Sequence, residues 1–105
     1  MKILFDQGTP VPLRRHLHPH HVDTSAERGW STLQNGELLD PAESDHYEAF
    51  ITTDGSLKYQ QNLTGRKLRI LALTTTSWPK IRKKIDQVRD ALGNLAEGGY
   101  TEVQI

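Results

Sequence analysis

Two aspartates stand directly after the segments that are most typical of buried strands. Asp6 follows Lys2-Ile3-Leu4-Phe5, and Asp54 follows Ala49-Phe50-Ile51-Thr52-Thr53. In a parallel α/β sheet the carboxyl ends of neighbouring strands meet at the edge where ligands bind. The sequence therefore predicts that Asp6 and Asp54 form one site and approach within reach of a single metal ion.

Clustered carboxylates suit a hard cation such as Mg²⁺ or Mn²⁺, which prefers oxygen ligands. Such an ion can activate a water molecule and stabilise charge on a phosphate. Glu37, just inside the helix expected after the second strand, is the best-placed third acid. The weaker candidates are Asp23, Glu27 and Asp40. The alternative is that each strand-end aspartate only caps a helix or turn, which is a common role for an acid there.

The histidines and the basic residues offer other chemistry. His16, His18, His20 and His21 surround Pro19, but their spacing fits no helical pair of zinc or nickel ligands, so a solvated loop is favoured. The basic residues form three clusters, 14–15, 66–69 and 80–89, which could contact phosphates without reading a base sequence. For the last cluster the alternative is a solvated helix face.

The two aspartates need a sheet that brings their strands together. Apolar and β-branched runs predict strands over residues 2–5, 20–24, 48–53, 68–73 and 100–105. Helical segments are expected between them, which favours right-handed crossovers and a parallel sheet covered on both faces. The simplest strand order is 2-1-3-4 with the last strand at an edge, so the strands that end in Asp6 and Asp54 are neighbours.

Capping signals mark where these helices start. Thr9 followed by Pro10 predicts a helix that continues to Leu17, and Asn35 is the expected N-cap of the next helix. Pro41 indicates either a kink in that helix or two short pieces. A short polar helix is expected over residues 56–62, and a longer one starts at Pro79 and ends before Gly98-Gly99.

The composition limits the classes of protein. The 105 residues predict one domain, residues 1–105, and 35% hydrophobic with 25% charged residues is ordinary for a soluble globular protein. Thirteen basic and thirteen acidic residues give no net charge, so a nucleic-acid partner must be argued from charge distribution. The absence of cysteine excludes disulfides, thiolate metal sites and a cysteine nucleophile. No segment is typical of a signal peptide or a membrane span, so we expect a cytoplasmic protein.

Four stretches carry a family resemblance: MKILFDQGTPVPLRRHL, ERGWSTLQNGELL, ITTDGSLKYQQNLTGRK and LRILALTTTSWPKIR. Their order and spacing resemble the short PIN-like proteins of bacteria, distant relatives of the VapC-type toxin nucleases. The resemblance covers almost the whole chain. It implies a three-layer α/β/α PIN-like sandwich with a small, mainly parallel sheet of four to five strands.

The resemblance also implies a site and an activity. In active PIN nucleases the gathered acids bind Mg²⁺ or Mn²⁺, and a water molecule attacks a phosphodiester in RNA. Carried over by position, Asp6, Glu37 and Asp54 are the catalytic and metal-binding acids. Related chains often carry acids where this one has Asn35 and Ser56, and fewer carboxylates imply weaker metal binding. The candidate substrate-binding residues are Thr9, Asn35, Ser56, Lys58 and Tyr59.

Three functions remain open at this point. The first is a metal-dependent ribonuclease, as in the toxin component of a toxin–antitoxin pair, which implies an antitoxin partner. The second is a PIN-like domain that has lost its chemistry and acts as an RNA- or protein-binding module. The third is an oligomer surface around Trp30 or Trp78, as in a homodimer, with the acids serving only as caps.

Overall fold

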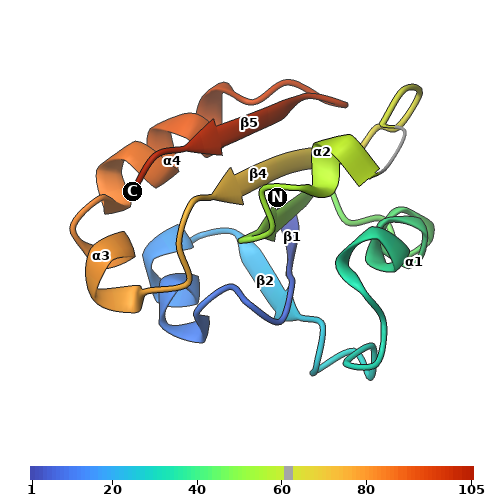
Figure 1. Cartoon of the computed structure of the whole chain (residues 1–105), viewed down its shortest axis with the longest axis horizontal. Helices are drawn as coiled ribbons and strands as arrows, with labels where there is room; N and C mark the ends of the chain where they lie inside the picture. The colour runs from blue at the N-terminus through green and yellow to red at the C-terminus, as the bar shows by residue number, and fades with distance from the viewer. Residues whose placement is uncertain (61–62) are drawn as a thin grey trace.

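A five-stranded parallel sheet forms the centre of the protein (Figure 1). The structure is a computed structural model that describes residues 1–60 and 63–105. The strands are β1 (Lys2–Phe5), β2 (His21–Thr24), β3 (Ala49–Thr52), β4 (Arg69–Leu73) and β5 (Tyr100–Val103). The helical segments are the 3₁₀ helices η1 (Val11–Leu17) and η2 (Asn35–Leu38), and the α-helices α1 (Leu39–Ser44), α2 (Leu57–Gln60), α3 (Trp78–Arg82) and α4 (Ile85–Asn94).

The strand order is β2-β1-β3-β4-β5, which confirms the predicted order with the last strand at an edge. β1 pairs with β3 in parallel, with Phe5 opposite Ile51. The backbone N–H of Asp6 extends this pairing by donating to the Ile51 carbonyl oxygen at 3.1 Å. The ends of the two strands that lead to the aspartates are therefore neighbours, as predicted.

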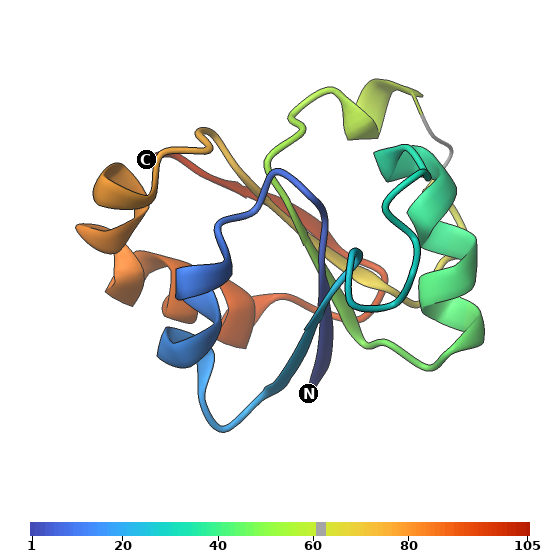
Figure 2. The same cartoon turned by 90° about the horizontal axis from the view of Figure 1, so that it is seen from below.

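Helices cover both faces of the sheet, which makes three layers (Figure 2). On one face Ile3 and Phe5 pack with buried residues of η1, α3 and α4, including Leu13, Ile81 and Val88. On the other face Leu4 and Phe50 pack with buried residues of η2, α1 and α2. Because alternate residues of a strand point to opposite faces, a continuous apolar strand supplies both cores. The α/β class is confirmed, and the assignment to the PIN-like family is treated as a proposal below.

The first helical segment differs from the prediction at its start. Residues 11–17 form a 3₁₀ helix whose N-cap is Pro10, not Thr9. The Thr9 hydroxyl cannot cap this helix because it lies against Asp6 and the Ile51 carbonyl oxygen. The segment ends before His18-Pro19, as predicted, and that peptide bond is cis.

The second helical segment consists of two short pieces, η2 and α1, which resolves the alternative at Pro41. Its N-cap is Gln34 rather than Asn35, so that prediction was wrong. Gln34 takes the position because it forms a capping box with Glu37, whose side chain accepts from the Gln34 backbone N–H at 2.9 Å. Asn35 then points its amide elsewhere, toward Asp54.

The third and fourth helical predictions need smaller corrections. The polar helix predicted over residues 56–62 is α2, four residues long, and residues 61–62 lie outside the described part. The single helix predicted from Pro79 is divided into α3 and α4 by the turn at Lys83 and Lys84. The expected apolar face survives this division, with Ile81, Val88 and Leu92 buried and Ile85 partly buried. No helix among the described residues is long and apolar enough to cross a bilayer.

A tight turn at Gly98-Gly99 returns the chain to β5. Gly98 has a φ of +75° and its N–H donates to the Lys67 carbonyl oxygen at 2.9 Å. A Cβ at Gly98 would lie 2.6 Å from the Arg66 carbonyl oxygen. Gly29 has the same φ of +75°, but a Cβ there would meet nothing within 4 Å.

Substituting alanine at Gly29 and at Gly98 distinguishes the cost of backbone strain from the cost of a steric clash. We expect Gly29→Ala to lower the free energy of unfolding by about 1 kcal/mol, because a Cβ disfavours the left-handed region. Gly98→Ala should cost about 1–3 kcal/mol more, because the turn must also move away from the Arg66 backbone. Urea unfolding of both variants measures the difference, and equal losses would contradict the close approach at Gly98.

Candidate functional site

Asp6 is buried at the end of β1, with 2% of its surface exposed. Its Oδ1 accepts from the Thr9 backbone N–H at 2.9 Å and lies 2.5 Å from the Thr9 hydroxyl. Its Oδ2 accepts from the Thr52 hydroxyl at 2.6 Å and from the Thr53 backbone N–H at 3.3 Å. A carboxylate has about four lone-pair positions, so four donors engage all of them.

The Thr52 hydroxyl connects the two predicted acids. It donates to Asp6 Oδ2 and accepts from the backbone N–H of Asp54 at 3.0 Å. Thr52 is itself fully buried. The structure thus brings the Asp6 carboxylate and the Asp54 backbone to the same hydroxyl, whereas the sequence predicts Thr52 only as part of a β-branched strand. A threonine two residues before a strand-end aspartate is the signal that could have identified it.

Asp54 is half-buried and faces the loop that follows β3. Its Oδ1 accepts from the Ser56 hydroxyl at 2.6 Å and the Ser56 backbone N–H at 3.0 Å. Its Oδ2 accepts from the Asn35 side-chain amide at 3.3 Å. The Ser56 hydroxyl, helped by the Ser56 N–H and Asn35, lowers the pKa of Asp54, although burial acts in the opposite direction. Asp54 is therefore negatively charged at neutral pH.

The remaining predicted acids point to other partners. Glu37 is exposed and accepts from the backbone of its own helix start. Asp23 accepts from the Tyr47 hydroxyl, Glu27 is paired with Arg14, and Asp40 with Arg66. Within the described residues, no group of three or more His, Asp or Glu side chains is arranged to hold a metal ion.

The donor set does not fit a three-carboxylate Mg²⁺ or Mn²⁺ centre. Asp6 is saturated by protein donors, and Glu37 is used by a capping box. Asp54 alone keeps an unfilled position, on Oδ2, because its other oxygen already accepts two bonds. Three of the five predicted substrate-binding residues, Thr9, Asn35 and Ser56, instead serve as donors to the two aspartates.

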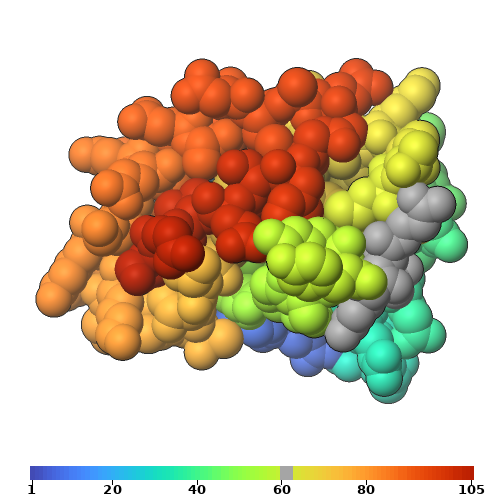
Figure 3. Space-filling view, turned by 45° about the horizontal axis from the view of Figure 1, so that its top comes forward, coloured from blue at the N-terminus to red at the C-terminus, as the bar shows by residue number. Residues whose placement is uncertain are grey.

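Lys58 and Tyr59 lie on α2 and face β5 and the solvent. Lys58 Nζ is 2.7 Å from Glu102 of β5, and this partner raises the pKa of Lys58. Figure 3 shows α2 and β5 side by side on this surface. The Tyr59 side chain is 80% exposed, with the Lys58 ammonium 5.0 Å from its ring centroid. Neither residue contacts the strand-end aspartates.

The histidines lie at the opposite end of η1 from Thr9. The His16 ring is 5.5 Å from the Trp78 ring, and His21 Nε2 is 3.1 Å from Asp23. Burial lowers the pKa of His20, so this imidazole is neutral at pH 7. His18 and His21 are exposed, in line with the predicted solvated loop.

A cationic segment lies at the same edge of the sheet as the two aspartates. It consists of Lys80, Arg82, Lys83 and Lys84, on α3 and the turn that follows it. Four residues separate the end of β4 from the start of α3, so the segment is close to the carboxyl end of that strand (Figure 1). In the described part of the chain no acid pairs with these four side chains.

Comparison with known proteins gives no relative. No protein-family model matches the chain, and no curated protein or solved structure does. The resemblance to the PIN-like family therefore stays a prediction from the sequence.

The bridging role of Thr52 can be tested by removing one hydroxyl. Thr52→Val leaves a buried carboxylate oxygen and a backbone N–H without their partner, so we expect a loss of about 1–3 kcal/mol in the free energy of unfolding. Thr101→Val, in β5, is the matched control, because no hydrogen bond joins its hydroxyl to another described residue. It should change stability by less than about 0.5 kcal/mol. Equal effects in chemical unfolding would contradict the bridge.

The lowered pKa of Asp54 predicts an acid-sensitive contribution to stability. The unfolded carboxyl group titrates near the ordinary aspartate pKa of about 3.9, and the folded one below it. Its contribution is complete above the unfolded value and is lost as pH falls through the lowered folded value. Asp54→Asn should therefore show a smaller loss of stability than wild type between pH 6 and pH 2 in urea unfolding. Ser56→Ala should also lose less stability than wild type between pH 6 and pH 2. If both variants lose as much stability as wild type, the lowered pKa of Asp54 is refuted.

Proposed function

We propose that this chain is a PIN-like domain whose strand-end carboxylates have become structural, and that it binds single-stranded RNA without cleaving it. The observation that carries the proposal is the saturation of Asp6, which accepts from four donors while buried. A metal ion could bind Asp6 only by displacing several of these hydrogen bonds. In this proposal the basic side chains at the carboxyl edge of the sheet bind RNA, and the aspartates only support the fold.

The cationic segment supplies the phosphate contacts in this proposal. Lys80, Arg82 and Lys83 are exposed, and Lys84 is half-buried. Residues 74–85 contain four basic side chains and no acid, although the whole chain has no net charge. Such a local excess attracts a polyanion even when the overall charge gives no attraction.

Aromatic side chains beside the cations supply the base contacts. Trp78 begins α3, is half-exposed, and lies against His16 of η1. Arg15 of η1 is exposed, and η1 and α3 are in contact. Single-stranded nucleic acids bind where bases stack on aromatic rings while cations follow the backbone. The cationic segment with Trp78 has both parts, and the family resemblance favours RNA as the strand.

A metal-dependent ribonuclease stays a prediction, and the geometry favours the binding module over it. Asp54 is negatively charged, but it has Asn35 and Ser56 as neighbours where further acids would strengthen metal binding. The antitoxin partner and the homodimer are predictions from the sequence alone.

The proposal predicts RNA binding that persists in a chelator. A fluorescent single-stranded RNA should bind equally in EDTA and in Mn²⁺, and the RNA should remain intact. If four cations contact phosphates, the slope of log K against log salt is roughly −3, at about −0.7 for each phosphate. Lys83→Ala should weaken binding and flatten the slope by about 0.7.

Lys67→Ala is the matched control, because it removes the same charge at the opposite edge of the sheet. It should leave the salt slope unchanged. Cleavage of the RNA in Mn²⁺ that Asp54→Asn abolishes would overturn the proposal in favour of the nuclease. Absence of RNA binding in EDTA at low salt would overturn it as well.

A further inference from the structure

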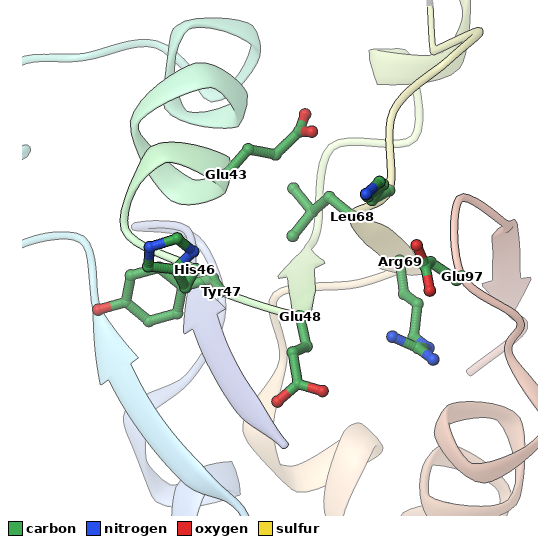
Figure 4. A pocket seen from close by; sticks show the side chains of 8 residues that line it. Glu43, His46, Tyr47, Glu48, Leu68, Arg69 and Glu97 are labelled. Carbon is green, nitrogen blue, oxygen red and sulfur yellow. The ribbon is translucent and has the colours of Figure 1, made fainter.

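A cavity of about 360 Å³ opens at the amino-terminal edge of the sheet, opposite the strand-end aspartates (Figure 4). It lies where β3 and β4 begin, between the end of α1 and the segment that follows α4. Its volume is in the range of roughly 300–1,000 Å³ that small-molecule sites occupy. The proposed RNA-binding function does not use it.

One wall of the cavity carries a net negative charge. Glu48 is exposed at the start of β3, and only its Oε1 is engaged, by the Lys2 backbone N–H at 3.1 Å. Glu43 lines the same wall, but Arg66 neutralises it through an ion pair. Figure 4 shows both glutamates on the side of the cavity formed by α1 and the start of β3. Glu48 is therefore the carboxylate available to a ligand.

The facing wall carries a net positive charge. Arg69 Nε donates to the Leu95 carbonyl oxygen at 3.1 Å, which fixes the guanidinium while its two terminal nitrogens have no partner among the described residues. Lys67 lies two residues earlier, is exposed, and has no acidic partner in the part of the chain that is described. Glu97 also lines the cavity (Figure 4), and its charge leaves Lys67, Arg69 and Glu97 together with one net positive charge.

The two walls do not neutralise each other. The backbones of Glu48 and Arg69 are joined by a 3.0 Å hydrogen bond from the Arg69 N–H to the Glu48 carbonyl oxygen. Their side chains nevertheless have other partners and form no ion pair with each other. Between the walls lie Leu68 and Tyr47, which are only 2% and 4% exposed and close the floor of the cavity.

We propose that this cavity binds a small dipolar ion of dipeptide size, with its ammonium at Glu48 and its carboxylate at Lys67 and Arg69. A ligand with one charge would leave one wall without a partner. A dipeptide extends to roughly 7 Å, which separates its two charges enough to reach side chains that do not reach each other. His46 on the rim has a φ of +65° because it ends α1 in a Schellman motif, in which the Tyr47 N–H donates to the Ala42 carbonyl oxygen at 2.9 Å.

The test uses the dipeptide Ala-Leu, titrated into the isotope-labelled protein by NMR and into unlabelled protein by calorimetry. Binding in the millimolar range or tighter is expected, with amide shifts at residues 46–48 and 67–69. N-acetyl-Ala-Leu, which lacks the ammonium, and Ala-Leu amide, which lacks the carboxylate, should both bind at least about threefold more weakly, the scale of one exposed ion pair.

Variants of the two walls test which wall binds the ammonium and which binds the carboxylate of Ala-Leu. Glu48→Gln should weaken Ala-Leu about two- to fivefold and leave N-acetyl-Ala-Leu unchanged. Lys67→Met should weaken Ala-Leu similarly and leave Ala-Leu amide unchanged, and it removes no hydrogen bond that the fold needs. Lys83→Met, at the other edge, is the control and should bind as wild type.

Two results would overturn the inference. One is the absence of amide shifts at residues 46–48 and 67–69 at 20 mM Ala-Leu. The other is equal affinity for the dipeptide and its two blocked forms, which would leave only non-specific apolar contact. Neither result bears on RNA binding, because the cationic segment lies at the opposite edge of the sheet.

Discussion

The buried carboxylate of Asp6 organises the edge of the sheet at which β1 and β3 end. A buried charge without hydrogen-bond donors costs several kcal/mol, so the chain must present donors around it. These come from the loop before η1, through Thr9, and from the end of β3, through Thr52 and Thr53. The approach is close, since a Cβ at Gly8 would lie 2.3 Å from the Thr53 hydroxyl oxygen. A side chain at residue 8 would therefore displace the Thr53 hydroxyl.

This arrangement separates two roles that a strand-end acid can have. Asp6 holds three segments together and has no lone pair left for a ligand, whereas Asp54 is half-buried, negatively charged and only partly engaged. Its partners Asn35 and Ser56 stabilise the charge without adding to it. The strand ends thus carry one partly accessible carboxylate, that of Asp54, while the carboxylate of Asp6 is buried. The cationic segment on α3 and its turn lies at that same edge.

The parallel sheet also gives the molecule two chemically different edges. At the carboxyl edge the loops carry hydroxyls, amides and the cationic segment. At the amino edge β3 and β4 begin side by side, and Glu48 and Arg69 share a backbone hydrogen bond while their side chains diverge. The packing of α1 and α4 on opposite faces leaves the cavity between their ends. The two ligands proposed above would therefore not compete for the same side chains.

The sequence by itself determined the α/β class, the strand order and the adjacency of the strands that end at Asp6 and Asp54, because these follow from local apolar runs and from the rule for crossovers. It also located most helical segments, but it misassigned Thr9 and Asn35 as N-caps. Only the tertiary structure decided where those side chains point: Thr9 to Asp6, and Asn35 to Asp54. The amino-edge cavity shows the same limit, since its residues come from separate segments without a shared motif. Hydrogen bonds between distant segments depend on how the segments pack in three dimensions. Local sequence propensities carry no information on that packing and so could not predict these partners.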